Sequence, residues 1–169
     1  MDIKTKNLVK TGEDGEILVR GLSVMKGYLN KPKETEDAFI VVNGKKYLRT
    51  GDIGYIDEKG VVHFRSRLKR MIISNGYNVY PANIEDVTLK CKLVNGCAVV
   101  GREDKLRGEK VVVFVVLNPD ASERAARKEL SQIYKKYLAK YEIPREIRFI
   151  KELPKTKLAK VDFKALEQL

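Results

Sequence analysis

A carboxylate that follows a tight turn is the first candidate for chemistry in this chain. Asp52 comes directly after Thr50 and Gly51, at the end of the run Tyr47–Asp52. A carboxylate held stiffly by such a turn can accept two hydrogen bonds, as from the two hydroxyls of a ribose. An ordinary surface turn with no ligand is the alternative interpretation.

Two cations further along the chain could act on a phosphate. Arg67 lies in a basic cluster, residues 67–70, and its planar guanidinium could form a fork onto phosphate oxygens. Lys160 lies in the segment Leu153–Asp162, whose apolar residues could hold the ammonium at a loop end, beside a carboxylate and a phosphate. A surface arginine at a linker and a solvated lysine in a basic tail are the alternatives.

The composition excludes several other kinds of chemistry. His63 is the single histidine, so Ser-His-Asp, Cys-His and multi-histidine sites are not expected, and we expect no metal ligands among the site residues. Cys91 and Cys97 are too few for a disulfide framework and are expected to be small buried hydrophobes. The longest apolar run, Val111–Leu117, is far shorter than the roughly 20 residues of a membrane span. We therefore expect a cytoplasmic protein with reduced thiols and no membrane span.

The net charge of +11 over 169 residues is distributed unevenly. Residues 1–66 carry 12 basic and 10 acidic side chains, a net charge of +2, whereas residues 67–169 carry 22 and 13, a net charge of +9. A cationic half of this size suggests an anionic partner: a nucleic acid, a phosphorylated small molecule or an acidic surface. A solvated, charge-rich surface is the alternative.

The patterns divide the chain into two regions, residues 1–68 and 69–169. Alternating polar and apolar positions predict short strands in the first region. Its apolar residues are few and scattered, so this β-rich region looks incomplete for a barrel or sandwich. The predicted strands are Glu16–Arg20, Tyr47–Arg49, Ile53–Asp57 and Val61–Arg65, and a short helix is predicted at Lys33–Phe39.

The second region is predicted to be a small α+β domain, with a sheet backed by helices. Asn75-Gly76 between two β-rich runs indicates a hairpin, because both turn positions need positive φ. Asp120 and Glu123 form a capping-box pattern before a helix that should run to about Tyr141. The other predicted elements are a helix from Pro81, strands at Gly96–Val100, Lys110–Leu117 (apolar on both faces, hence central) and Glu146–Ile150, a loop at Gly101–Gly108, and a last helix at Asp162–Leu169.

Six motifs in one register resemble the acyl-adenylate-forming (AMP-binding) superfamily, which includes acyl-CoA synthetases, peptide-synthetase adenylation domains and beetle luciferases. The resemblance covers nearly the whole chain and is to the C-terminal portion of an acyl-CoA synthetase. The matching segments are Gly15–Gly21, Met25–Asn30, Arg49–Asp52, Ser66–Lys69 with Asn75–Pro81 and Ile84-Glu85, Gly101–Asp104 with Arg107–Glu109, and Leu153–Asp162.

This resemblance implies an enzyme that joins a carboxylic acid to ATP, releases pyrophosphate, and passes the acyl group from AMP to a thiol, usually that of coenzyme A. Asp52 then binds the ribose hydroxyls, and Arg67 contacts the ribose or a phosphate. Lys160 bridges the substrate carboxylate and the α-phosphate during adenylation. Lys69 falls on the hinge about which the small C-terminal domain swings between the two half-reactions.

The same resemblance implies a channel for the pantetheine arm of coenzyme A, exposed when the small domain has moved. ATP and Mg²⁺ are expected to be bound mainly by a large N-terminal domain of the enzyme. The candidates for lining the channel are Ser74, Asn75, Gly76 and Tyr77.

The chain also departs from the family pattern. Ala159 stands where glycine usually precedes the lysine, a change we expect to be tolerated, and Ile73 stands where some members carry a lysine. No Ser/Thr/Gly-rich phosphate loop, adenine-binding segment or acyl pocket precedes Gly15. We therefore expect residues 1–68 to be the last subdomain of the large domain and residues 69–169 to be the mobile small domain.

The resulting hypothesis is a C-terminal fragment of a ligase of fatty acid metabolism that does not catalyse adenylation alone. One alternative is a stand-alone partner subunit of a split adenylate-forming enzyme. The other is a basic nucleic-acid-binding module, although no aromatic-rich RNA-recognition strand, KH loop or zinc finger is visible.

Overall fold

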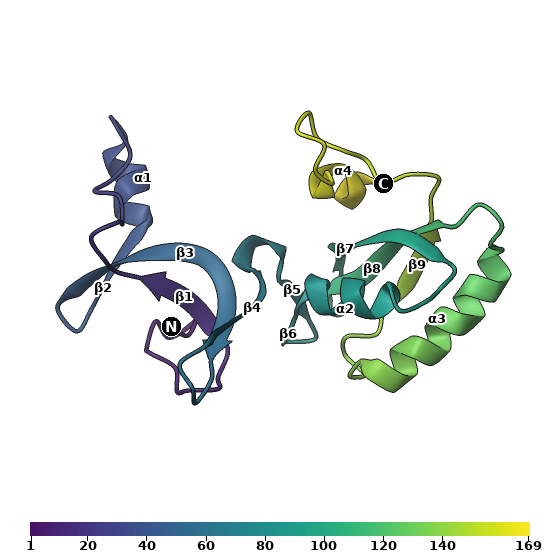
Figure 1. Ribbon diagram of the computed structural model, residues 1–169, viewed down its shortest axis with the longest axis horizontal. Helices are drawn as coiled ribbons and strands as arrows, with labels where there is room; N and C mark the ends of the chain where they lie inside the picture. The colour runs from purple at the N-terminus through teal and green to yellow at the C-terminus, as the bar shows by residue number, and fades with distance from the viewer. The chain divides into compact units, whose positions relative to one another are not determined.

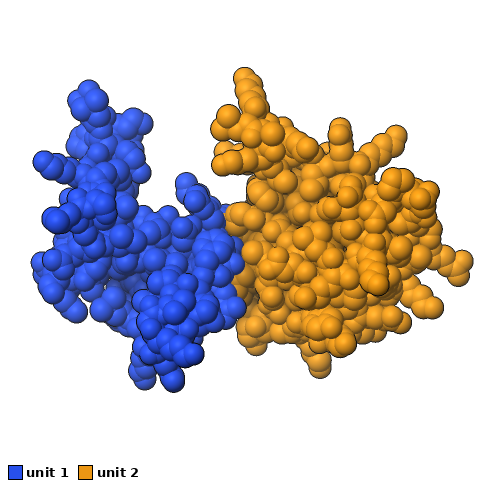
Figure 2. Space-filling model, in the orientation of Figure 1, with its two compact units in different colours: residues 1–69 blue, residues 70–169 orange.

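The computed structural model describes all residues from 1 to 169, and they form two compact units, Met1–Lys69 and Arg70–Leu169 (Figure 2). Each unit has a sheet of its own and at least one helix. None of the helices combines the length and the apolar character needed to cross a bilayer. The predicted α+β fold class is confirmed.

One long strand organises the first unit. β3 (Lys45–Ile56) pairs antiparallel with β1 (Gly15–Val19), β2 (Phe39–Val42) and β4 (Val62–Arg67), and the short helix α1 (Pro32–Asp37) precedes β2 (Figure 1). Two separate strands were predicted where β3 runs without a break. The predicted helix at Lys33–Phe39 was too long, because Phe39 already pairs with β3 as the first residue of a strand that the sequence did not indicate.

The hydrophobic core of the first unit is small. Met1 and Ile53 are its buried hydrophobic residues. Large apolar side chains on the same unit are strongly exposed, among them Leu22, Leu29, Val41 and Phe64. Exposed apolar surface of this kind is typical of a face that binds another protein segment.

Five strands and three helices form the second unit. The strands are β5 (Ile72–Ser74), β6 (Tyr77–Val79), β7 (Val94–Asp104), β8 (Gly108–Leu117) and β9 (Glu146–Phe149). β8 pairs antiparallel with β5 and β7 and parallel with β9. The helices are α2 (Pro81–Thr88), α3 (Glu123–Tyr137) and α4 (Phe163–Gln168).

β8 is the centre of this unit and is buried on both faces, as predicted. Its residues Val111, Val113 and Val115 belong to a cluster that includes buried side chains of α2 and α3. The alternate residues Val112 and Phe114 belong to a second cluster, which includes the buried side chain of α4 (Figure 1). A strand covered on both faces has no polar side, which explains its continuous apolar sequence.

Two boundaries in the second unit differ from the prediction. The predicted loop at Gly101–Gly108 is wrong, because β7 continues to Asp104 and pairs with β8 through charged residues at the solvent-exposed end of the hairpin. The helix α3 is capped by the Ser122 side chain, which accepts a hydrogen bond from the Ala125 N–H, and not by Asp120. It ends at Tyr137 rather than near Tyr141.

The predicted Asn-Gly hairpin joins β5 to β6. Asn75 has φ of 51° and Gly76 has φ of 80°, so both turn residues are left-handed, as a two-residue turn of this type requires. Asn75 N–H also donates to the Arg107 carbonyl over 2.9 Å, which ties the hairpin to the β7–β8 turn.

Gly76→Ala should lower the free energy of unfolding of the second unit by about 1 kcal/mol, because an L-residue is disfavoured at this positive φ. A Cβ at Gly76 would meet no atom within 4 Å, so only the backbone is tested. Urea unfolding followed by circular dichroism gives the value. Gly96→Ala, in β7, is the control, because φ there is not positive and a Cβ would make an ordinary 3.8 Å contact. Unfolding free energies that match between Gly76→Ala and the unchanged chain would contradict the prediction.

Candidate functional site

The Thr50-Gly51-Asp52 segment is a bulge within β3 and not a separate turn. Glu16 of β1 lies opposite Ile53, and Leu18 lies opposite Arg49, so three residues of β3 face one residue of β1. Gly51 supplies the positive φ of 70° that the bulge needs. The bulge bends the backbone of β3 next to Asp52.

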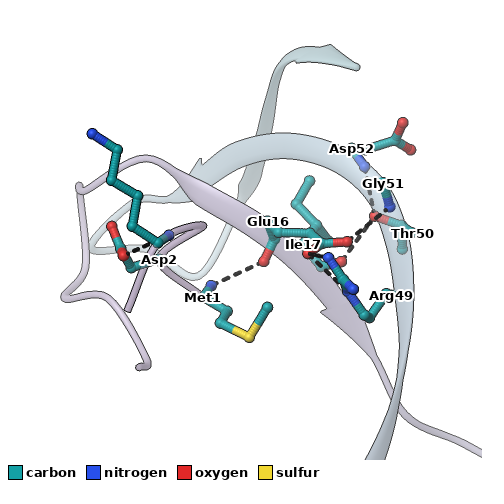
Figure 3. A network of polar contacts seen from close by, with 9 residues as sticks. Met1, Asp2, Glu16, Ile17, Arg49, Thr50, Gly51 and Asp52 are labelled. Carbon is teal, nitrogen blue, oxygen red and sulfur yellow. Dashed lines mark hydrogen bonds and ion pairs between the residues drawn. The ribbon is translucent and has the colours of Figure 1, made fainter. Parts of the chain in front are cut away.

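A buried carboxylate holds this bulge. The Glu16 side chain is 1% exposed, and its Oε2 accepts hydrogen bonds from Arg49 Nε (3.1 Å) and Nη2 (2.9 Å). Its Oε1 accepts from the Gly51 N–H at 3.3 Å (Figure 3). The sequence suggested only a polar strand position for Glu16, because its partners lie more than 30 residues away.

The hydroxyl of Thr50 completes the network. Thr50 Oγ1 donates to the Ile17 carbonyl over 2.8 Å and accepts from the Asp52 N–H over 3.0 Å (Figure 3). The backbone of Asp52 is therefore fixed by a residue of its own motif. Its carboxylate points away from the network (Figure 3).

Asp52 and Arg67 are brought together by the sheet. They lie opposite each other where β3 pairs with β4, and Arg67 Nε is 3.1 Å from Asp52 Oδ1, an ion-pair distance. Oδ1 is nevertheless buried and accepts no hydrogen bond, because the guanidinium N–H is not aligned with it. The Arg67 side chain is 70% exposed. This pair offers a carboxylate acceptor and an exposed cation side by side.

Lys69 lies in the connection between the units. It belongs to a single 3-10 turn, η1 (Leu68–Arg70), and is the last residue of the first unit. Short 3-10 turns are frequent as connectors between elements.

The four predicted channel residues lie at the β5–β6 hairpin. Ser74 is buried, whereas Asn75, Gly76 and Tyr77 are exposed. The Tyr77 ring stacks on the Tyr141 ring, with centroids 4.6 Å apart. Glycine at position 76 suits the turn itself, because φ there is positive, whereas a Cβ would meet no atom within 4 Å.

Lys160 lies on an ordered loop between β9 and α4. Thr156 N–H donates to the Lys160 carbonyl over 2.7 Å, and Ala159 N–H donates to the Thr156 carbonyl over 2.9 Å. At the base of the loop, Asp162 N–H donates to the Pro154 carbonyl over 2.8 Å. The Lys160 side chain is exposed and makes no hydrogen bond or ion pair. The loop thus presents a free ammonium on a defined backbone.

Ala159 adopts a left-handed conformation, with φ of 59°. This conformation explains how glycine would suit the position, and alanine tolerates it at a cost of about 1–2 kcal/mol.

Other chemistry finds no support in the described residues. Burial raises the pKa of the Cys97 thiol to about 12, and nearby Glu85 and Asp86 add to the shift. A thiol with such a pKa is not a nucleophile at neutral pH. No group of three or more His, Cys, Asp and Glu residues in the chain could hold a metal ion.

Comparison with known proteins gives one consistent result. Residues 83–160 match the family described as the AMP-binding enzyme C-terminal domain. The long-chain-fatty-acid–CoA ligase of Bacillus subtilis strain 168 is 42% identical over 94% of this chain and 27% of its own length. The 2-succinylbenzoate–CoA ligase of Listeria monocytogenes serotype 4b is 40% identical over 95% of this chain and 32% of its own length.

Solved structures agree with these relatives. ATP-bound MatB from Rhodopseudomonas palustris superposes with a TM-score of 0.85 at 32% identity, covering 99% of this chain and 32% of that protein. The chain thus spans about a third of the length of the proteins that it matches.

Glu16→Gln should destabilise the first unit by about 2 kcal/mol, because it leaves Arg49 without a charged partner in a largely buried position. Hydrogen exchange at the Gly51 and Asp52 amides should rise at the same time, because both belong to the network. Glu58→Gln, at an exposed site of the same unit, is the control. If both variants unfold at the same denaturant concentration, Glu16 does not hold the bulge.

Proposed function

We propose, from the premise that this chain corresponds to the C-terminal portion of AMP-forming ligases, that it completes the active site of an acyl-CoA synthetase. The proposed reaction has two steps. A carboxylate oxygen of the substrate attacks the α-phosphorus of ATP, and pyrophosphate leaves. The thiol of coenzyme A then attacks the acyl carbon of the acyl-AMP, and AMP leaves as the thioester forms.

The Asp52–Arg67 pair is the observation that carries this proposal. Asp52 Oδ1 is a buried acceptor without a hydrogen bond, and an unsatisfied buried carboxylate oxygen is costly unless a ligand donates to it. Two vicinal hydroxyls of a ribose are suitable donors for one carboxylate. The exposed guanidinium of Arg67, 3.1 Å away, is placed to contact the ribose or a phosphate of the same nucleotide.

Lys160 is the proposed catalytic residue of the first step. Negative charge builds up on the α-phosphate oxygens as the carboxylate attacks, so a cation placed there stabilises the transition state more than the ground state. The unpaired ammonium of Lys160 on an ordered loop suits this role, because little reorganisation precedes the contact.

The second step uses another face of the second unit. We propose that residues 1–68 end a large adenylation domain and that residues 69–169 form a mobile domain turning about Lys69. The boundary of the compact units, after Lys69, supports this division. The β5–β6 hairpin, with Ser74 to Tyr77, then borders the path of the pantetheine arm. The net positive charge of the second region suits the phosphates of coenzyme A.

A large preceding domain is the proposed partner of the first unit. An open groove of about 760 Å³ lies beside α1 and β2 and is lined by apolar side chains that include Leu29, Phe39 and Val41. Together with the small core of this unit, the groove supports burial against another domain. That domain would bind most of the ATP and the Mg²⁺.

A fatty acid is the proposed substrate, supported by the 42% identical long-chain-fatty-acid–CoA ligase. The relative named for 2-succinylbenzoate makes that acid the necessary comparison in any assay. A cytoplasmic location completes the proposal, and two unpaired cysteines support it.

A stand-alone partner subunit is the second candidate, favoured by the same exposed apolar surface of the first unit. Mixing the chain with a separately produced N-terminal portion of a related ligase distinguishes the two. Activity restored on mixing favours the subunit, and activity that needs a continuous chain favours the ligase domain. No observation favours a nucleic-acid-binding module.

Lys160→Ala should slow adenylation by about 10²–10³-fold and leave thioester formation from preformed acyl-AMP within a few-fold of normal. The measurement uses a chimaera in which this chain replaces the aligned segment of the Bacillus subtilis ligase, with ATP–pyrophosphate exchange as the first readout. Lys157→Ala, an exposed lysine of the same loop, is the matched control and should change neither step.

Equal losses in both half-reactions would refute the role of Lys160.

The isolated 169-residue chain should show no ATP–pyrophosphate exchange with any acid of a panel that includes palmitate and 2-succinylbenzoate. Robust exchange by this chain alone would overturn the proposal that it depends on another domain.

A further inference from the structure

Arg70 connects three elements of the second unit although it lies at the very start of that unit. It is the last residue of η1 and directly follows Lys69. Its Nη2 lies 2.5 Å from Glu85 Oε1 on α2, and its guanidinium carbon lies 3.8 Å from the centre of the Phe163 ring. The side chains of Arg70 and Glu85 are only 27% and 18% exposed.

Glu85 fixes the orientation of this guanidinium. Glu85 Oε1 also accepts a hydrogen bond from the Val99 N–H at 2.9 Å, so the carboxylate is bound to the backbone of β7. The guanidinium is therefore held at one edge by an anchored acceptor while its flat face covers an aromatic ring. A lysine could supply the charge but not this combination of planar contacts.

Phe163 lies at the base of the Lys160 loop, where Leu153 and Val161 also pack against the cluster that contains Leu166. It is the first residue of α4 and follows Asp162, whose side chain caps the helix by accepting from the Ala165 N–H at 3.1 Å. The Asp162 N–H closes the base of the loop on the Pro154 carbonyl. One turn later, α4 is fixed by the fully buried Leu166. Phe163 is thus the residue of this helix that is nearest in sequence to Lys160.

We propose that Arg70 is a positioning residue for Lys160. Through its contacts with Glu85 and Phe163, Arg70 joins the start of α4 to the segment that follows Lys69. The base of the Lys160 loop, which leads into α4, is joined to the same segment. The inference rests on the proposed role of Lys160. It adds that the segment leaving Lys69 and the Lys160 loop move as one body, so the ammonium arrives at the nucleotide in a fixed orientation.

Hydrogen exchange in the complete 169-residue chain tests the structural link without any substrate. The amides of Thr156, Ala159 and Asp162, which close the loop, should exchange roughly three- to tenfold faster in Arg70→Gln and in Phe163→Leu. Phe163→Tyr keeps the ring and should retain normal exchange. The two effects on exchange should be less than additive in the double variant, because both changes remove the contact between Arg70 and Phe163.

Arg127→Gln is the matched control. Arg127 lies on α3 and stacks over Phe149 at 5.1 Å, in the cluster on the other face of β8. It should leave the three amides unchanged. Unchanged exchange in Arg70→Gln, or equal acceleration in Arg127→Gln, overturns the link between Arg70 and the loop.

The chimaeric ligase supplies the functional readout. Arg70→Gln and Phe163→Leu should slow adenylation roughly three- to tenfold and leave thioester formation from acyl-AMP unchanged. Phe163→Tyr, which keeps the aromatic ring, should adenylate at the normal rate. A loss shared equally by both half-reactions overturns the positioning role. If Lys160→Ala itself fails to separate the half-reactions, the proposed function fails, while the exchange experiment still decides whether Arg70 holds the loop.

Discussion

Burial of β8 on both faces is the constraint on which the second unit depends. A strand of this kind needs an apolar layer on each side, and α2 and α3 supply one layer while α4 supplies the other. The chain leaves β9 at Phe149 and must cross to the opposite face before α4 can begin at Phe163. The loop with Lys160 is the last part of this crossing. The position of the proposed catalytic lysine therefore follows from the packing of a strand that has no role in the chemistry.

The first unit holds its candidate residues by a different kind of interaction. It has little hydrophobic core, and the bulge that carries Asp52 is fixed by the buried carboxylate of Glu16 and its pairing with Arg49. Such a pair contributes modest net stability, because both charges must be desolvated, but it defines the geometry of the backbone N–H groups that it binds. A single arrangement of Asp52 is thus maintained in a sheet that buries few side chains.

Local patterns predicted the elements whose causes are local. The left-handed pair Asn75-Gly76, the helix that begins at Pro81 and the central strand at Lys110–Leu117 were all found at the predicted places. Thr50-Gly51 was interpreted as a turn because glycine with positive φ suits both a turn and a bulge, and only the partner strand β1 distinguishes them. The charged end of β7 was interpreted as a loop for a similar reason, since a ladder in solvent has no apolar pattern.

The residues that hold the candidate site could not be predicted from local sequence patterns. Glu16 and Arg49 are 33 positions apart, and the partners Arg70 and Phe163 are even more distant in sequence. No spacing rule relates such pairs, because the sheet register and the packing of α4 bring them together. By contrast, Asp52, Arg67 and Lys160 were identified from motifs, and their proposed roles depend on a nucleotide.

Chemical rescue of Lys160→Ala by small primary alkylamines tests the central claim most directly. An ethylammonium ion that enters the space left by the side chain restores the positive charge without restoring the covalent connection. We predict that ethylamine increases the rate of acyl-AMP formation in proportion to its concentration and has no effect on the transfer of the acyl group to coenzyme A. An adenylation rate that does not respond to the amine, or an equal response in both steps, would contradict the account.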